Sequence, residues 1–194
     1  MDKAVLISIR PQWIVKIARG EKIIEVRKTR PKLNPPFKCY IYCTKAQKPV
    51  LVALQNLEDS PYVMTCGDAS KKYPVEDTTW ARLLNGTVCG EFTCHTILPI
   101  TVFDNGSIKD WNYWSLNEAC MSYEDMAGYI GHGKQGYGWR ISELKIYESP
   151  KELSELHHDC SQCGYVNARW DNCDFIIKRP PQSWCYVKCH VEKI

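Results

Sequence analysis

The sequence predicts an α+β protein in which short helices are attached to a mostly β framework, arranged as a small mixed or antiparallel barrel. Apolar runs of strand length occur near the start, the middle and the end of the chain, so partner strands lie far apart in the sequence. The helix signals between them are short. The 194 residues are enough for one domain with a real core, which we expect to span residues 1–194.

The first fifty residues predict three strands and one helix. Residues 4–9 (AVLISI) form an apolar run that is typical of a buried strand. A proline in the first turn and a glycine after the last residue delimit a helix over residues 11–19. Charged and apolar residues alternate over residues 21–28, which indicates a second strand with mixed faces, and residues 37–45 form a third strand.

Patterns in the rest of the chain are weaker, and residues 46–87 hold few of them. Two Ser-x-x-acidic spacings, typical of capping boxes, predict two further short helices. The remaining expected elements are a helix near 79–84, a turn at Asn85-Gly86, a long strand over 87–103 bent at Gly90 or Pro99, a helix from Ser115 to Cys120, a helix from Ser122 to Ile130, a glycine-rich loop over 131–139, a strand over 139–148 and a closing β segment over 175–191.

Positive charge is concentrated in the N-terminal part of the chain. Residues 1–50 contain 12 of the 25 Lys and Arg residues but only three of the 22 Asp and Glu residues. They therefore carry a net charge of +9, whereas the remaining residues carry −6. Such segregation is typical of a face that meets phosphates, and we favour an anionic partner over a merely solvated lysine-rich surface.

The apolar residues and the cysteines indicate a cytoplasmic protein without a membrane partner. The first apolar run is broken by Arg10 and Pro11, and no later run is long enough for a membrane span. The eleven cysteines are an odd number without an export signal, so a disulfide framework is not expected. We expect the cysteines of the first two thirds to be small buried side chains.

The segment GEKIIEVR, residues 20–27, carries a recognisable motif. Gly20, Lys22, Glu25 and Arg27 match the pattern Gly-x-Lys-x-x-Glu-x-Arg. The longer phrase SIRPQWIVKIARGEKIIEVRK strongly resembles the start of an ASCH domain, a family of PUA-like β-barrels. The later segments GEFTCHTI and YGWRISELKIYESPKELSEL resemble phage- and prophage-associated members. The resemblance covers most of residues 1–150 and extends weakly to RPPQSWCYV near the end of the chain.

The resemblance implies a PUA-like barrel that binds RNA or a modified nucleotide. The PUA-like group, including the YTH and EVE domains, is associated with RNA binding and with recognition of modified bases. In ASCH domains the motif lines a cleft between the first helix and the second strand. This implies that Lys22, Glu25 and Arg27 line such a cleft here, and that RNA or a nucleotide-like molecule is the partner.

The chemistry of the motif residues agrees with such a site. Lys22 and Arg27 can pair with a phosphate or polarise a carbonyl group. Glu25 can accept hydrogen bonds from the exocyclic amine of a base, or accept a proton. The alternative is an ion network of the same three side chains that only holds the turn.

Three residues outside the motif are further candidates for ligand binding. Trp13 and Trp139 can stack on a base, because an aromatic face accepts any base. Arg10 belongs to the basic N-terminal surface and adds positive charge beside the motif. The alternative for both tryptophans is a place in the core, where most Trp side chains lie.

An enzyme and a protein-interaction module stay open as alternatives. Some small ASCH-like proteins resemble amidohydrolases of acetylated cytidine, and a ribonuclease activity has been proposed for others. The amidohydrolase type has a Thr three residues after the motif Lys, where this chain has Glu25, so that mechanism does not carry over. A hydrolase version would use Glu25 as general base and Lys22 to stabilise an oxyanion. Its later Glu falls near Glu118.

Residues 157–174 are expected to form an insertion rich in Cys and His. Cys160 and Cys163 form a Cys-x-x-Cys turn typical of a zinc knuckle, with Cys173 as third and His158 as fourth ligand. The alternatives for the fourth ligand are His157, Cys185 and Cys189. A structural zinc and a loop of reduced cysteines without metal fit the pattern equally well. No organic cofactor is expected.

Overall fold

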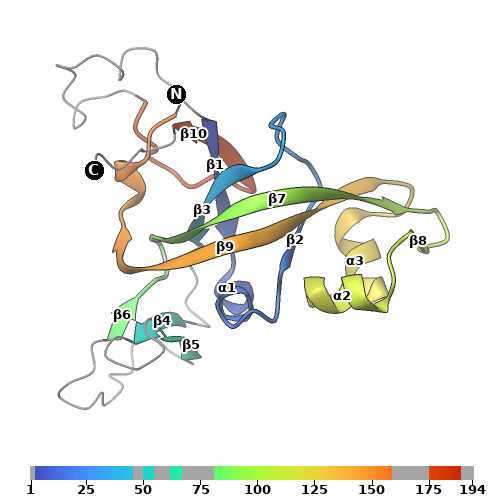
Figure 1. Ribbon diagram of the computed structural model, residues 1–194, viewed down its shortest axis with the longest axis horizontal. Helices are drawn as coiled ribbons and strands as arrows, with labels where there is room; N and C mark the ends of the chain where they lie inside the picture. Colours follow the sequence, from blue (N-terminus) through green and yellow to red (C-terminus); the bar gives the residue numbers. More distant parts are fainter. Residues whose placement is uncertain (1–2, 46–49, 55–61, 67–80, 159–174, 189–194) are drawn as a thin grey trace.

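The structure is a computed structural model, which describes residues 3–45, 50–54, 62–66, 81–158 and 175–188. The long strands β7 and β9 cross the molecule side by side, with α2 and α3 at one end (Figure 1). In chain order the elements are β1 (Lys3–Ile9), α1 (Pro11–Ala18), β2 (Ile24–Arg27), β3 (Phe37–Cys43), β4 (Val50–Leu54), β5 (Tyr62–Cys66), β6 (Ala81–Leu83), β7 (Val88–Val102), β8 (Ile108–Lys109), α2 (Tyr113–Ala119), α3 (Tyr123–Ile130), β9 (Gln135–Lys151), the 3-10 helix η1 (Leu153–Glu155) and β10 (Trp184–Lys188).

A seven-stranded sheet forms the framework, in the order β10-β1-β3-β7-β9-β2 with β8 paired to the end of β7. All neighbours are antiparallel except β1 and β3, which run parallel. Within the described residues the backbone pairing ends at β10 and β2, so this sheet is not closed. The expected α+β class is confirmed, but the expected barrel is an open mixed sheet.

The first elements form where the sequence predicts them. β1 is an apolar strand whose residues Ala4 to Ile9 are all buried. Pro11 occupies the first turn of α1, where its missing N–H removes no hydrogen bond. Gly20 ends the helix with φ of +72°, a left-handed conformation that L side chains rarely adopt.

Three other expectations need correction, and for β7 the choice between Gly90 and Pro99 is decided. Residues 81–83 form strand β6 instead of a helix, and β6 joins β4 and β5 in a second sheet of order β5-β4-β6. Helix α2 begins at Tyr113, because Asn112 accepts the backbone N–H of Ser115 and caps the helix. Strand β9 already starts at Gln135, inside the expected glycine-rich loop. Strand β7 is irregular around Gly90, whereas the pairing continues through Pro99 without a register shift.

The core consists of three clusters of buried side chains. The first lies between the sheet and α1, the second joins β2 and the end of β7 to α2 and α3, and the third packs β1 and β3 against Leu156 and Ile177. Four of the scattered cysteines are buried free thiols, as expected: Cys39, Cys43, Cys89 and Cys94. Cys120 is only half-buried.

The helices are short throughout. The three α-helices have eight, seven and eight residues. Across the part of the chain that the structure describes, no helix has both the length and the apolar character that a membrane span requires.

Candidate functional site

The turn between α1 and β2 positions the motif side chains. After Gly20 the chain folds back on α1, and the N–H groups of Glu21 and Lys22 both donate to the Lys16 carbonyl, at 2.9 and 3.1 Å. Lys22 therefore precedes β2 by two residues, and its side chain reaches Glu25 three residues later. Glu25 and Arg27 are two apart on β2, so they share one face of the strand.

Lys22, Glu25 and Arg27 form a buried network, which we call the charged trio. Arg27 Nη2 lies 2.9 Å from Glu25 Oε1, and Lys22 Nζ lies 3.6 Å from Glu25 Oε2. The three residues are only 3, 6 and 7% exposed. Strand β2 is shorter than expected, and its faces are not mixed: Glu25 and Arg27 share one face, Ile24 and Val26 lie on the other, and all four residues are buried.

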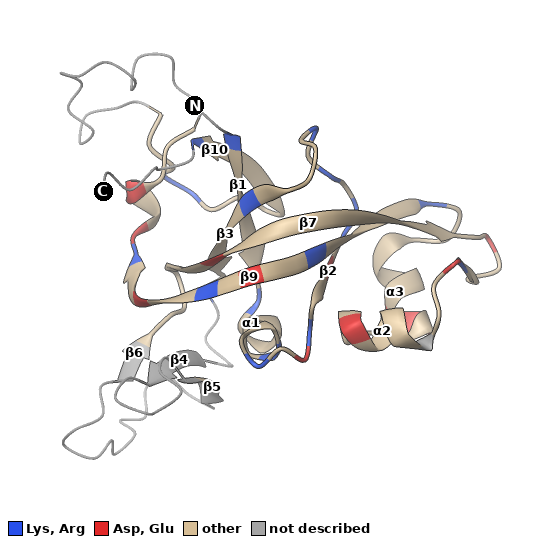
Figure 2. Ribbon diagram, in the orientation of Figure 1, with Lys and Arg blue, Asp and Glu red and all other residues tan. Residues whose placement is uncertain are grey.

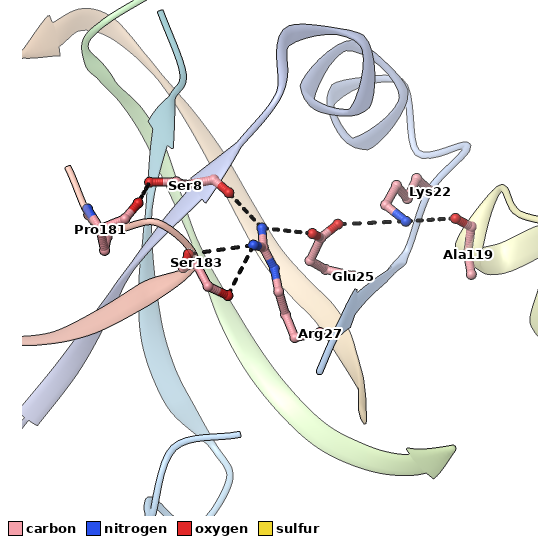
Figure 3. A network of polar contacts seen from close by, with 7 residues as sticks. All are labelled: Ser8, Lys22, Glu25, Arg27, Ala119, Pro181 and Ser183. Atoms are coloured by element: carbon pink, nitrogen blue, oxygen red, sulfur yellow. Dashed lines mark hydrogen bonds and ion pairs between the residues drawn. The ribbon is translucent and has the colours of Figure 1, made fainter. Parts of the chain in front are cut away.

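Arg27 connects the open edges of the sheet. Its Nη2 donates to the Ser8 carbonyl at 2.6 Å, and its Nη1 lies 3.5 and 3.4 Å from the carbonyl and hydroxyl oxygens of Ser183. Figure 3 shows the resulting chain of contacts from Pro181 through Ser8, Arg27 and Glu25 to Lys22. Side chains therefore span the gap that backbone pairing leaves open between β2 and the β1–β10 pair.

Burial dominates the electrostatics of Lys22. Desolvation lowers the pKa of its ammonium group, and the neighbouring Glu25 carboxylate partly opposes this shift. The ammonium group donates to the Ala119 carbonyl at the end of α2, at 2.6 Å. In Arg27, by contrast, the buried Nε finds no hydrogen-bond partner among the described residues. The trio thus holds a buried donor that an incoming acceptor could satisfy.

Aromatic side chains from two helices lie beside the trio. Trp13 on α1 is half-buried, and Lys22 Nζ lies 5.2 Å from the centre of its ring. Tyr129 on α3 is 38% exposed and lies within electrostatic reach of Arg27, Glu25 and Arg10. Burial raises the pKa of the Tyr129 hydroxyl. Tyr129 was not among the predicted site residues, because no sequence pattern links it to a motif about a hundred residues earlier.

Trp139 lies in the core. It is 0% exposed, and its ring packs against Phe37 and Trp184 at centroid distances of 5.9 and 6.0 Å. It pairs with Glu25 in the register of β2 and β9. Its ring therefore lies on the same face of the sheet as Glu25, and because it is fully buried no base can stack on it.

Exposed cations surround the trio. Arg10 is exposed at the start of α1, and Lys28 and Arg30 are exposed after β2. Lys28 Nζ lies 5.3 Å from the ring centre of Tyr129, and the Arg30 guanidinium lies 5.9 Å from that of Tyr137. Figure 2 shows Lys and Arg positions along α1, β2 and the connection from β2 to β3, whereas α2 carries an acidic position.

Of the residues considered for hydrolysis, Glu25 lies beside Lys22, whereas the Glu118 side chain is paired with another residue. The Glu118 carboxylate pairs with Arg140 at 3.1 Å, and it is the next carbonyl, that of Ala119, that contacts Lys22. Cys120 follows in the left-handed conformation and its thiol lies within electrostatic reach of Lys22. If the site were a hydrolase, the carboxylate next to Lys22 would thus be that of Glu25.

Three of the predicted zinc ligands, Cys160, Cys163 and Cys173, lie outside the described residues. His158 is exposed, and its Nδ1 lies 3.2 Å from the Tyr186 carbonyl oxygen. No group of three or more His, Cys, Asp or Glu residues in the described ranges is arranged to hold a metal ion. The zinc knuckle over residues 157–174 stays a prediction.

Comparison with known proteins supports the fold. No family model matches the sequence, and no curated protein matches it. The structure is similar to the crystal structure of ASCH from Zymomonas mobilis, with a TM-score of 0.54 and 15% identity, over 95% of this chain and 87% of that chain. Two single-substitution variants of that protein match with TM-scores of 0.54 and 0.52, at 15 and 16% identity, over 96 and 95% of this chain and 91 and 88% of theirs. The chain therefore has the fold of these ASCH structures.

Proposed function

We propose that this ASCH-fold protein binds RNA, or a nucleotide-like part of it, at the surface above the charged trio. The observation that carries the proposal is the burial of Lys22, Glu25 and Arg27 in one network at an open edge of the sheet. Buried charges are expensive to desolvate, and apolar residues of similar size often stabilise a fold as well or better. A buried charge network is thus a poor device for stability alone, which supports a role in binding.

The surroundings of the trio support an RNA ligand in particular. Trp13 and Tyr129 offer aromatic surface for stacking, worth about 1–3 kcal/mol per base. Arg10, Lys28 and Arg30 are exposed and can pair with backbone phosphates. The fold adds support, because the PUA-like group that the sequence resembles is associated with RNA and modified bases.

The test is binding of fluorescently labelled single-stranded RNA, measured by anisotropy at about 50 and about 200 mM salt. Lys22→Met removes the charge and keeps the volume of the side chain, and Lys109→Ala removes an exposed charge on β8. We expect the wild type and Lys109→Ala to bind with similar affinity and a steep salt dependence. Lys22→Met should bind about tenfold more weakly, because it removes a buried positive charge from beneath the proposed binding surface and frees its Glu25 neighbour.

Two results would count against RNA binding at the trio. One is RNA binding that Lys22→Met does not weaken, and the other is an absence of RNA binding by the wild type. If the wild type does not bind RNA but its basic surface binds an acidic protein, the protein-interaction module is favoured. A polyanion competitor distinguishes general charge attraction from recognition of RNA.

A hydrolase is the second candidate, and the lowered pKa of Lys22 is the observation that favours it. Perturbed lysines next to a carboxylate are frequent in catalytic sites, where they stabilise developing negative charge. Incubation with RNA and with a panel of modified nucleosides, followed by mass spectrometry, tests this candidate. Product from the wild type that disappears in Glu25→Gln would establish a reaction, and its mass would identify the bond broken.

A further inference from the structure

A hollow of about 720 Å³ lies on the far side of Ser8 from the charged trio. The end of β1, the end of β3, the turn at Gly86, η1 and the segment 176–182 form its walls. No member of the trio lines it. Ser8 belongs to both regions, because its carbonyl accepts from Arg27 while its hydroxyl donates to the wall of the hollow at Pro181. The hollow is therefore a separate candidate site.

The hollow has a surplus of positive charge. Lys45, Lys178 and Arg179 line it and are exposed. Within the described residues none of the three forms an ion pair. Glu152 is the one carboxylate among the lining residues, and its side chain accepts the backbone N–H of Glu155 in a capping box at η1. The three cations are thus available to an anionic ligand.

The wall that carries two of these cations is fixed at both ends. At one end Ile177 is 1% exposed, and its N–H donates to the Leu156 carbonyl at 3.0 Å. At the other end the Ser8 hydroxyl donates to the Pro181 carbonyl at 2.6 Å, and the Ser8 N–H donates to the Ser183 carbonyl at 3.0 Å. Consecutive prolines stiffen the stretch between them. The backbone at Lys178 and Arg179 is therefore held in place before any ligand arrives.

The third cation is positioned by a glycine. Gly86 has φ of +86°, and a Cβ built there would lie 3.1 Å from Cγ and Cε of Lys45. The turn is tied to β3 by the Gly86 N–H, which donates to the Cys43 carbonyl at 2.8 Å. The missing side chain at Gly86 thus gives the Lys45 stem a place to lie along the edge of the hollow.

We propose that this hollow binds a phosphate ester of nucleotide size. Three cations that form no ion pair with any described residue suit a phosphate group, which carries more than one negative charge. Leu153, Ile176 and the two prolines offer apolar surface to the organic part of the ligand. The volume lies in the range of about 300–1,000 Å³ that is usual for small-molecule sites. The site is additional to RNA binding at the trio, and the phosphate can come from a free nucleotide or from the end of an RNA chain.

The experiment is calorimetric titration of adenosine 5′-monophosphate and of inorganic phosphate. Lys178→Ala/Arg179→Ala removes two charges from the hollow. The matched control Lys109→Ala/Lys134→Ala removes two exposed charges from the opposite end of the β7–β9 pair. We expect the wild type and the control to bind the nucleotide equally and more tightly than phosphate. The hollow variant should bind it at least about tenfold more weakly, with an unchanged Tm because both side chains are exposed.

A second comparison identifies the source of the phosphate. If a 5′-phosphate strengthens binding of a single-stranded RNA in the wild type and the control but not in the hollow variant, the ligand is an RNA end. If RNAs with and without the 5′-phosphate bind equally while the nucleotide binds as expected, the ligand is a free nucleotide. The proposal is overturned if the wild type shows no saturable binding of the nucleotide, or if the hollow variant binds it as tightly as the control.

Discussion

The charged trio and the hollow contain the same kinds of cation but use them differently. Lys22 and Arg27 are nearly fully buried, and both lie beside the Glu25 carboxylate. Lys178 and Arg179 are exposed and have no ion pair within the described residues. Ser8 contacts both regions. The comparison teaches that burial, more than residue type, divides charges that contact one another inside the fold from charges that are exposed to direct contact with a ligand.

Arg27→Met should give the largest effect, because it breaks the buried network and the bridge between the sheet edges. It removes the contacts with Ser8 and Ser183 and leaves Glu25 buried with Lys22 alone. Loss of one partner from a buried ion pair destabilises a protein by about 3–5 kcal/mol. Urea unfolding followed by circular dichroism measures the change.

The matched control for this variant is Arg30→Met, which changes an exposed arginine three residues further along the chain. An exposed substitution of this kind is expected to change the free energy of unfolding by no more than about 0.5 kcal/mol. Equal destabilisation by both substitutions would show that Arg27 does not bridge the sheet edges.

Ser8→Ala should give an intermediate effect, because Ser8 joins the two regions through a neutral hydrogen bond. The lost bond runs from the hydroxyl to the Pro181 carbonyl at 2.6 Å, and a bond of this kind contributes about 1 kcal/mol. The backbone contacts of Ser8 with Arg27 and Ser183 remain. Ser183→Ala is the control, since its hydroxyl lies 3.4 Å from Arg27, and it should change stability less. If Ser183→Ala lowered the free energy of unfolding more than Ser8→Ala, the Ser8 hydroxyl would not be the more important of the two.

The smallest effect concerns pH and Lys22. Because burial lowers its pKa in the folded state, the unfolded chain binds more protons between that lowered pKa and the ordinary value of 10.5. The Lys22 contribution to stability therefore rises with pH across this window. Urea unfolding of the wild type and of Lys22→Met from neutral to alkaline pH should show a difference that shifts in favour of the wild type as pH rises. A difference that stays constant would mean that Lys22 is not desolvated.

Local patterns were sufficient for the elements that depend on neighbours in sequence. The apolar run of β1, the proline and glycine that delimit α1, and the Ser122 cap of α3 are all found where the sequence predicts them. The expectation near residues 79–84 was wrong, because pairing with β4 makes residues 81–83 a strand. Asn112, and not Ser115 as expected, caps α2, because its side chain accepts the Ser115 N–H three residues later.

The sequence by itself determined that Gly20, Lys22, Glu25 and Arg27 form one local unit, because a turn and a short strand fix their spacing. Only the tertiary structure decided how deeply the trio is buried and that Arg27 reaches Ser8 and Ser183, which are 19 and 156 residues away in the sequence. It also decided that Trp139 is core and Tyr129 is at the surface. The physical reason is that burial and long-range contacts depend on which strands become neighbours, and this is a property of the whole sheet.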